Sequence, residues 1–387
     1  MSPTRTSHPR RILVLGAGIV GAACAEALAS DGHEVTLVDR GEIAGGTTQA
    51  GMGHVVVITS SPALLALTRY SQQEWIRHAS RWDARVPVRQ CGTLWVARER
   101  TEEMTMVDRL ERELSANDIP SERYGATEIH SAEPHLAETV EVALKVPDDL
   151  VVDAVAATHR LVEEAKRHGA RVRTGTLVER VSEHGALLVD GSWIEADELV
   201  VAAGVDSVRL LPALGLRPRK GHLVHVGTPT EYIHAQLGEI GYAQGAASDA
   251  DEAVSFNVQP APRGGLYVGA SRQYDATSPD VEERIVQLLF TRAREFLPGI
   301  GRYPVLRRWT GFRPAAPDHR PFIGRWPDRA GLWVATGHEG LGITCSLGTG
   351  RLLADMIAER EPAISSAPFR PDGRLLGPTD ADFHHRG

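Results

Sequence analysis

The stretch "RILVLGAGIVGAACAEALASDGHEVTLVD", residues 11–39, decides the fold. Residues 11–16 are a short apolar run of the kind expected for a buried parallel strand. Residues 19–30 are rich in alanine and predict a helix, and residues 33–39 repeat the strand pattern. Together the three segments predict a strand–helix–strand unit at the start of an α/β domain.

A glycine pattern marks the turn from the first strand into the helix. Residues 16–21, "GAGIVG", have the G-x-G-x-x-G spacing, in which Gly16 permits a tight turn and Gly18 lets the backbone approach a pyrophosphate. Gly21 lets helix and strand pack closely, and the helix N-terminus offers N–H groups to phosphates. Asp39 ends the next strand, where an acid accepts hydrogen bonds from a ribose. Because strand, helix and acid are in register, the pattern favours a dinucleotide site over a chance glycine-rich turn.

The segment after Asp39 favours a flavin over a nicotinamide. Spacing alone does not separate FAD from NAD, but a second copy of the glycine pattern is missing, since "GHEGLG" at 337–342 has the wrong spacing. A single nucleotide site must then carry the redox group itself. Residues 40–53, "RGEIAGGTTQAGMG", are glycine-rich and can approach a flat ring through their backbone.

The rest of the chain predicts an α/β fold in which a Rossmann-like nucleotide domain carries an inserted β-rich α+β domain. Strands are expected at 88–100, 170–181, 197–204 and 331–337 with several more within 219–274, and helices at 61–82, 101–118, 151–169, 280–297 and 348–361. The expected domains are a nucleotide domain at 10–85, 149–218 and 311–362, a substrate domain at 86–148 and 219–310, and a loose tail at 363–387.

Composition limits the function classes. The chain has 387 residues, 42% hydrophobic and 24% charged, with a formal net charge of −8, which argues against nucleic acid as the main partner. Its three cysteines lie far apart, so neither a zinc ribbon nor a redox pair is indicated. No metal is expected. No stretch has the roughly 20 apolar residues of a membrane span. We therefore expect a cytoplasmic protein, with peripheral association at the inner face of the membrane as an alternative.

Four motifs in order make the chain similar to the D-amino acid oxidase superfamily, which includes glycine oxidase, sarcosine oxidase and the D-amino acid dehydrogenases. They are the glycine fingerprint with residues 39–53, "VVAAGVDS" at 200–207, "GFRPAAPDHRPFIG" at 311–324 and "GHEGLGIT" at 337–344. "KGHLVHV", "EIGYAQGA" and "VGASRQY" further resemble catalytic subunits of D-hydroxyproline and opine-type dehydrogenases. The resemblance implies a glutathione-reductase type of FAD-binding domain. It also implies non-covalent FAD, because no cysteine stands near Gly311 and Phe312.

The resemblance also implies which residues hold FAD. The backbone of Val178 would lie against the adenine, Ala203 and Gly204 would approach the cofactor from the central sheet, and the "GHEGLGIT" segment would donate N–H groups to the flavin. The full set expected to bind FAD is Gly16, Gly18, Ile19, Val20, Gly21, Asp39, Arg40, Thr47, Thr48, Ala50, Gly51, Met52, Val178, Ala203, Gly204, Arg313, Gly340, Leu341, Gly342 and Ile343.

The same resemblance assigns Arg313 to the substrate carboxylate, and a guanidinium can fork onto a carboxylate with two parallel hydrogen bonds. The alternative is a structural ion pair of Arg313 with Asp318 or another acid. Tyr242 and Arg272 could complete the carboxylate clamp, and packing residues are the alternative. His54 could face the flavin or be structural.

The second candidate histidine is His338, at the start of an H-E-x-x-H-like pattern. The second histidine position of that pattern is occupied by Gly342, so a zinc site is rejected. Asp318, His319 and Arg320 are expected to shape the turn that follows Arg313.

The implied reaction is oxidation of a small amino or imino acid, with hydride transfer from Cα to flavin N5 to give an imine. D-Proline and cis-4-hydroxy-D-proline are the leading substrates, and the alternatives are a glycine or sarcosine oxidase using O₂, a flavin-binding subunit without turnover of its own, and an FAD enzyme of other chemistry. The electron acceptor, whether O₂, a quinone or a partner subunit, stays open.

Overall fold

The computed structural model describes residues 9–57, 61–98, 100–242, 250–274 and 276–376, which divide into two compact units. Unit 1 comprises residues 9–49, 154–218 and 313–376, and unit 2 comprises the described residues of 50–153 and 219–312. The chain passes from one unit to the other four times, so neither unit is a continuous segment.

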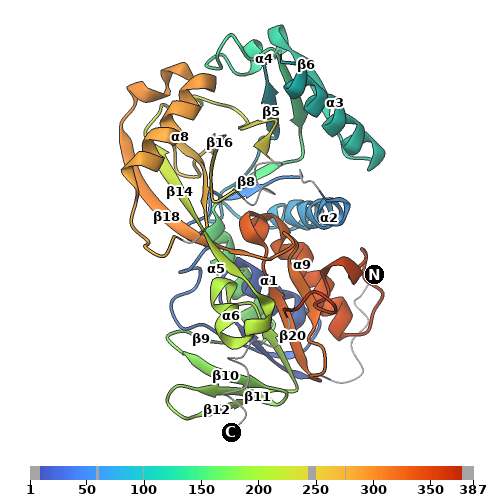
Figure 1. Cartoon of the computed structure of the whole chain (residues 1–387). Coiled ribbons are helices and arrows are strands. Elements are labelled where there is room, and N and C mark those ends of the chain that lie inside the picture. Colours follow the sequence, from blue (N-terminus) through green and yellow to red (C-terminus); the bar gives the residue numbers. More distant parts are fainter. Residues whose placement is uncertain (1–8, 58–60, 99, 243–249, 275, 377–387) are drawn as a thin grey trace. The chain divides into compact units, whose positions relative to one another are not determined.

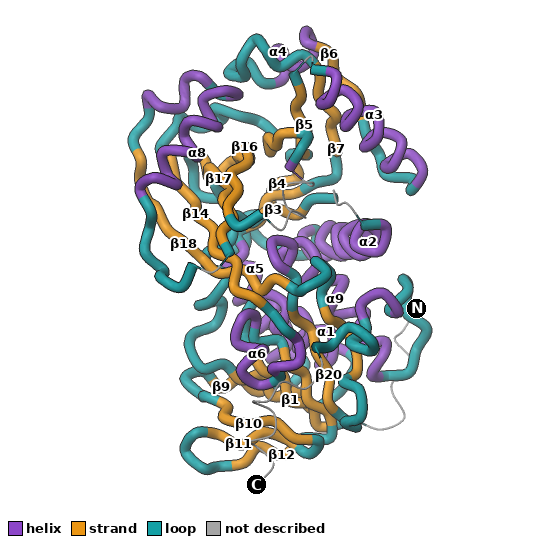
Figure 2. Tube along the Cα trace, viewed as in Figure 1, coloured by secondary structure: helices purple, strands orange, loops and turns teal. Residues whose placement is uncertain are grey.

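A six-stranded sheet in the order β19-β20-β13-β1-β2-β9 forms the centre of unit 1 (Figures 1 and 2). β1 pairs in parallel with β2 and β13, β13 pairs in parallel with β20, and β19 is antiparallel at the edge. Unit 1 consists of β1 (Arg11–Leu15), α1 (Ile19–Ser30), β2 (Glu34–Val38), α5 (Ala154–Arg167), β9 (Arg171–Arg173), β10 (Val178–Ser182), β11 (Gly185–Leu188), β12 (Trp193–Glu195), β13 (Glu198–Val201), η1 (Gly204–Asp206), α6 (Ser207–Leu210), η2 (Pro212–Leu214), β19 (Phe322–Arg325), β20 (Leu332–Thr336), η4 (Glu339–Leu341), α9 (Gly342–Ile357) and η5 (Ala367–Phe369).

Both faces of this sheet are covered, which explains why β1 is a continuous apolar run. On one face, Leu13 and Leu15 share a core with the antiparallel β10-β11-β12 sheet. Helices α5 and α9 each pack on α1, and α1 packs on β1 and β2. Small residues let α1 and α9 approach closely, because a Cβ on Gly350 would lie 2.5 Å from the Ala23 carbonyl oxygen.

Unit 2 contains a mixed eight-stranded sheet, β18-β14-β17-β16-β15-β5-β7-β6, and the small antiparallel sheet β3-β8-β4. Figure 2 shows α8 beside β16 and β17, and Phe256 stacks on Phe296 of α8 with ring centroids 4.4 Å apart. Unit 2 consists of β3 (His54–Val55), α2 (Pro62–Ala79), β4 (Val88–Gln90), β5 (Thr93–Ala97), α3 (Thr101–Ala116), β6 (Glu122–Gly125), α4 (Ala126–Ala132), β7 (Val142–Val146), β8 (Leu150–Val152), β15 (Gln236–Glu239), β16 (Glu252–Pro260), β17 (Leu266–Gln273), α8 (Glu283–Phe296) and η3 (Pro298–Arg302). β14 (Arg217–Val226) and β18 (Val305–Ala315) run across the boundary between the units in sequence.

The predicted α/β class with a Rossmann-like sheet and a β-rich second unit is confirmed. Several element boundaries differ, three of them in the first half of the chain. The strand expected at 88–100 is two strands, because Gly92 takes a positive φ of 71° and breaks the run. The helix expected from 151 starts at Ala154, because residues 150–152 pair with β3 and β4. The strand expected at 170–181 is divided between β9 and β10, which belong to different sheets.

Several segments group differently from the expected domains. Residues 50–85, 149–153 and 311–312, expected in the nucleotide domain, belong to unit 2, where His54 and Val55 pair with Val151 and Leu150. Residues 363–376, expected to be loose, pack on unit 1: Phe369 is buried and Arg374 pairs with Asp318 at 2.7 Å. The remainder of the expected tail, 377–387, lies outside the described residues.

Candidate functional site

The glycine turn before α1 leaves no room for a side chain at its first and third glycines. Gly16 has a φ of +108°, and a Cβ there would lie 2.4 Å from the Ala202 carbonyl oxygen. A Cβ on Gly21 would lie 1.8 Å from the Gly16 carbonyl oxygen. The first and third glycines are therefore required by the backbone itself. At Gly18 a Cβ would come within 3.2 Å of Thr48 Oγ1, so this position is tight but not closed.

The N-terminus of α1 is organised by two side chains. The Ile19 N–H, at the start of the helix, donates to Thr48 Oγ1 at 3.0 Å, and Val20 follows in the first turn. Asp39 accepts from the backbone N–H groups of Ala17 at 2.6 Å and residue 41 at 2.7 Å. A carboxylate held beside a helix N-terminus and a glycine turn fits a dinucleotide, with ribose at the acid and phosphates at the N–H groups.

Other expected cofactor residues in unit 1 lie at strand ends and turns. Arg40, next to Asp39, pairs with Asp206 at 2.8 Å. Val178 begins β10, and its carbonyl accepts from Arg209 Nη2 at 2.7 Å.

The segment after β13 has a backbone conformation that suits close approach to a cofactor. Ala203 precedes Gly204, which has a φ of +59° and whose carbonyl accepts from Thr336 Oγ1 at 3.2 Å. A Cβ on Gly204 would lie 3.9 Å from Thr47 Oγ1. These contacts bring the loop containing Thr47 together with the end of β13.

The "GHEGLGIT" motif forms η4 and the first turn of α9. Gly340 is exposed and Leu341 half-buried in η4, and Gly342 and Ile343 open the helix. The helix predicted to start at residue 348 starts at Gly342 instead. The motif therefore presents the positive end of the α9 helix dipole. Arg313 of β18 lies beside this turn, with its Cδ and Nε 3.7 Å from the position of a Cβ on Gly340.

The turn after Arg313 is held by ion pairs. Burial alone would raise the pKa of Asp318, but hydrogen bonds and charge from Arg374 and Arg320 lower it below its usual value. Among the described residues, the ion-pair partners of Asp318 are these two arginines, so the alternative pairing of Asp318 with Arg313 does not form. His319 has a φ of +57° and pairs with Glu339 at 3.3 Å. These contacts agree with a turn-shaping role.

His338 lies in a position unsuited to proton transfer. It is 5% exposed, and its Nε2 lies 2.9 Å from Thr349 Oγ1. Burial lowers the pKa of His338 to about 3, so the ring stays neutral near pH 7. The geometry favours a structural role in fixing the start of α9 over the catalytic role expected from sequence.

The predicted substrate residues Tyr242 and Arg272 meet in unit 2. The Arg272 guanidinium carbon lies 4.7 Å from the centroid of the Tyr242 ring, and its Nη1 donates to Ser255 Oγ at 3.3 Å. Arg272 is only 3% exposed. No carboxylate in the described part of the chain forms an ion pair with it. His54 is buried in β3, paired with Val151.

Residues 50–52, which are also expected to bind FAD, belong to unit 2, whereas the other residues expected to bind FAD belong to unit 1. The Ala50 carbonyl accepts from Trp309 Nε1 at 3.2 Å, and the Met52 carbonyl accepts from Gln259 Nε2 at 2.7 Å. Gly51, between them, is half-buried. A Cβ on Gly311 would lie 2.3 Å from the Ala50 Cβ, so β18 and this segment are in close contact.

Sequence reasoning missed the polar face of β16. Ser255, Asn257 and Gln259 alternate with Phe256 and Val258, which belong to the core under α8. The three polar side chains are at most 6% exposed, so both faces of the strand are buried and one of them is polar. The period-two pattern within "VSFNVQ" was the available signal.

A second residue that was missed is Arg219 of β14, which is fully buried. Its guanidinium carbon lies 4.5 Å from the centroid of the Tyr274 ring. Nothing in its short sequence context distinguishes it from a surface arginine, so only the structure identifies it as buried.

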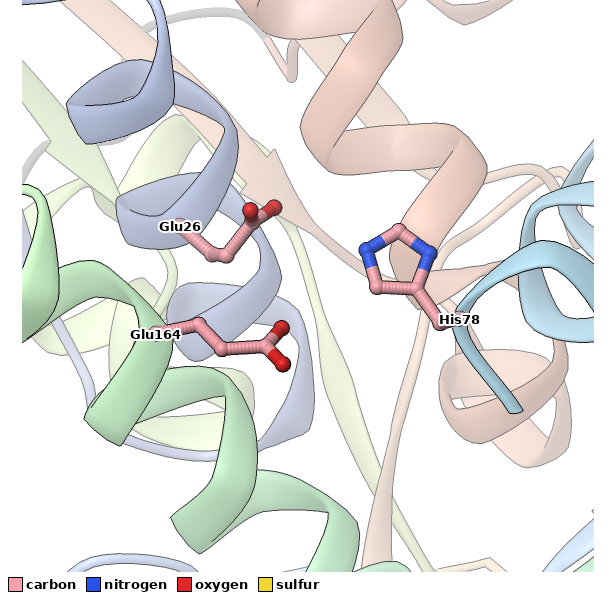
Figure 3. Close-up of side chains that lie close together, drawn as sticks. All are labelled: Glu26, His78 and Glu164. Carbon is pink, nitrogen blue, oxygen red and sulfur yellow. The ribbon is translucent and has the colours of Figure 1, made fainter. Parts of the chain in front are cut away.

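Figure 3 shows two carboxylates of unit 1 that lie close together, Glu26 of α1 and Glu164 of α5. Glu164 pairs with Arg160 at 2.8 Å and with Arg167 at 3.5 Å, so arginines offset its charge and the pair supports no metal assignment. His78, drawn in the same figure, belongs to unit 2, where its Nδ1 lies 3.0 Å from the Glu74 carbonyl oxygen.

Comparisons with known proteins agree with a nucleotide-binding site in unit 1. The family model described as "FAD dependent oxidoreductase" matches residues 11–356. The chain is 28% identical to glycine oxidase of Pseudomonas putida, covering 95% of this chain and 99% of the relative. It is 30% identical to D-amino acid dehydrogenase of Cereibacter sphaeroides, covering 92% and 94%. The crystal structure of glycine oxidase from Geobacillus kaustophilus superimposes with a TM-score of 0.82 at 26% identity, covering 94% and 98%.

In the part of the chain that the structure describes, no helix is both long and apolar enough to span a membrane.

The glycine turn, Asp39 and the start of α9 fit FAD, and the family match covers all of these elements. The chain therefore belongs to the FAD-dependent oxidoreductases of the D-amino acid oxidase superfamily, and it is an enzyme that uses FAD.

Proposed function

We propose that the protein oxidises a small amino or imino acid at the carbon bearing the amine, using non-covalently bound FAD. The observation that carries this proposal is the position of Arg313 beside Gly340, in the turn that leads into α9. A guanidinium at this point can bind the substrate carboxylate through two hydrogen bonds.

The chain supplies binding and orientation. FAD, when bound, supplies the chemistry by accepting a hydride from the substrate carbon. Gly16, Gly18 and Asp39 would hold its nucleotide half, and the N–H groups at the start of α9 would favour negative charge on the flavin. Arg313 would fix the carboxylate and thereby orient the amine, which contributes to the rate without a strong side-chain base.

The buried state of the thiols supports a non-covalent cofactor. Cys24 and Cys345 are fully buried, and burial raises the pKa of both thiols, that of Cys24 to about 12. Cys91 is half-buried, and burial raises the pKa of its thiol to about 11. A protonated thiol is a poor nucleophile, so we expect acid precipitation to release all of the flavin into the supernatant. Flavin that stays with the precipitated protein would contradict this.

Two substrate classes are proposed in order. D-Proline and cis-4-hydroxy-D-proline come first, on the resemblance of residues 220–226 and 268–274 to D-hydroxyproline dehydrogenase subunits. Glycine and sarcosine come second, on the 28% identity to a glycine oxidase along almost the whole chain. The electron acceptor is O₂, a quinone or a partner protein, and the reduced enzyme can be mixed with each to distinguish them.

Anaerobic titration tests the proposal. The FAD-loaded protein is mixed without oxygen with D-proline, cis-4-hydroxy-D-proline, glycine and sarcosine in turn, and the visible flavin band is followed. Bleaching by one of them identifies the class. If neither these nor a broad set of other amino acids bleaches the band, the proposed function is wrong and an FAD enzyme of other chemistry is favoured.

A further inference from the structure

Unit 2 contains a pocket of about 270 Å³, and none of the residues that line it is expected to bind FAD or substrate. Three segments form its walls: residues 87–89 at β4, residues 229–233 between β14 and β15, and residues 260–266 at the turn from β16 to β17. An apolar cavity of about 150 Å³ can hold benzene, so this pocket has room for a ring with a short polar chain. Its volume therefore suits a ligand of amino-acid size.

The walls of the pocket are held in place by contacts within unit 2. In the turn from β16 to β17, the Ala261 N–H donates to the Gly265 carbonyl at 2.9 Å. In the second wall, the Tyr232 ring stacks on His135 with centroids 4.2 Å apart. The ring of a proline fixes φ, and four of the lining residues are prolines: Pro87, Pro229, Pro260 and Pro262. A site built in this way is preformed, so little conformational freedom is lost when a ligand binds.

Much of the pocket lining is apolar. Besides the prolines, Tyr232, Ile233 and Leu266 line the pocket, and all three also belong to the core under α8. An apolar side chain placed against this lining leaves water, which favours binding by about 25 cal/mol for each Å² buried. A concave apolar site with a few polar groups at its edge is the usual form of a small-molecule site.

Two opposite charges belong to the same pocket. Arg89 is exposed, and its Nη2 donates to the His234 carbonyl at 3.0 Å, but no carboxylate of the described residues forms an ion pair with it. Glu231 is also exposed, and no cation of the described residues pairs with it. Its φ of +64° is uncommon outside glycine, and such backbone conformations cluster at ligand-binding sites. A ligand that carries one anion and one cation matches this pair of side chains.

We propose that this pocket binds an amino acid with a large apolar side chain, in its zwitterionic form. The carboxylate meets Arg89, since a guanidinium binds a carboxylate through two parallel hydrogen bonds. The ammonium group meets Glu231, and the side chain fills the apolar lining. This site goes beyond the proposed function, because it does not involve Arg313 and requires no oxidation of the amino acid that it binds.

α-Methylphenylalanine and 2-aminoisobutyrate test the pocket. Both lack a hydrogen on Cα and therefore cannot give up a hydride, and they differ by one phenyl ring on the same zwitterion. Binding of each to the FAD-loaded protein is measured by calorimetry. We expect α-methylphenylalanine to bind about tenfold to a hundredfold more tightly, because its ring is buried against the lining. Equal affinities, or no binding of either compound, would overturn the proposal.

Variants of the pocket wall locate the bound ligand. Arg89→Gln should weaken α-methylphenylalanine binding by about fivefold to tenfold, the value of an exposed two-bond ion pair. Thr230→Trp adds bulk at an exposed position of the wall and should weaken it by about tenfold or more. The matched control is Arg85→Gln, which removes an exposed guanidinium that pairs with Asp83 outside the pocket and should leave the affinity unchanged. Unaltered binding in Arg89→Gln and Thr230→Trp would show that the proposal is wrong.

Two further variants separate this pocket from the proposed substrate site. Arg313→Met should leave the affinity for α-methylphenylalanine unchanged. A loss in Arg313→Met as large as that in Arg89→Gln would place the ligand at the proposed substrate site and overturn the inference. Glu231→Gln should weaken α-methylphenylalanine but not 3-phenylpropionate, which lacks the ammonium group. An equal effect on both compounds would overturn the assignment of a zwitterion.

Discussion

Asp149 offers a perturbation whose size can be worked out from the structure. This residue precedes β8 and is fully buried in unit 2. One carboxylate oxygen accepts from the Val57 N–H at 3.1 Å and from Gln72 Nε2 at 2.7 Å. Burial raises the pKa of Asp149 to about 7 against these hydrogen bonds. The substitution Asp149→Asn keeps a carbonyl oxygen for both donors and removes the charge.

Proton linkage determines whether the free energy of unfolding rises or falls with pH. The folded protein keeps the Asp149 proton up to about pH 7, whereas the unfolded chain loses it near its ordinary value of 3.8. The folded state therefore binds more protons in this window, and the free energy of unfolding falls as pH rises from about 4 to 7. A shift of roughly three units corresponds to about 4 kcal/mol at most. Above pH 7 the whole penalty is present, and Asp149→Asn should be the more stable protein.

Urea unfolding of the FAD-loaded protein at pH 5 and pH 8 measures this effect, with Trp75 and Trp95 of unit 2 as fluorescence reporters. We expect the variant to gain about 2–3 kcal/mol of stability relative to the unmodified protein between the two pH values, because part of the pH window lies below pH 5. Parallel behaviour of the two proteins would show that Asp149 is ionised in the folded state, and the reasoning from burial would be refuted.

Three further predictions concern unit 1. Arg313→Lys should keep the flavin spectrum and lose about tenfold to a hundredfold in kcat/KM, because lysine cannot form the two-bond fork; loss of flavin instead would make Arg313 structural. Gly21→Ala should abolish flavin binding, since its Cβ would meet the Gly16 carbonyl oxygen, and full flavin content in the purified variant would contradict this. His338→Gln should make the free energy of unfolding depend less on pH between 3 and 6.5. Because burial lowers the pKa of His338 to about 3, the stability that the neutral ring contributes is present above pH 6.5 and is lost as pH falls towards 3. Melting temperatures of the variant that fall with pH as steeply as those of the unmodified protein would disprove this.

The part of the fold that could be predicted rests on short-range signals. Residues 11–39 contain a strand, a helix, a second strand and the glycine turn in one continuous segment, and each was found within a residue or two. The start of α9 could not be found in this way. Gly342, Gly348 and Gly350 lower local helix propensity, yet Gly350 allows the close approach to α1, so a tertiary contact decides where the helix runs.

The residues of the candidate site also divide into those explained by local sequence and those explained by contacts between distant segments. Gly16 and Gly21 are explained by turn geometry within a few residues, which a sequence displays directly. The environment of Arg272 depends on the pairing of β17 with β16, which the sequence around Arg272 does not display. Residues 50–52 group with unit 2 because β3 pairs with β8, nearly a hundred residues later.

The four passages of the chain between the units bear on how the protein is made. Strand β1, synthesised early, has its partner β13 only after residue 201, and β20 and α9 follow after residue 331. The turn beside Arg313 and the start of α9 belong to this last stretch. A nascent chain therefore cannot complete unit 1 until the residues of α9 have left the ribosome, and no gene fragment that encodes a single segment of a unit can produce that whole unit. Unit 2, whose last strand is β18, becomes complete first, so cofactor capture is a late event in the maturation of this enzyme.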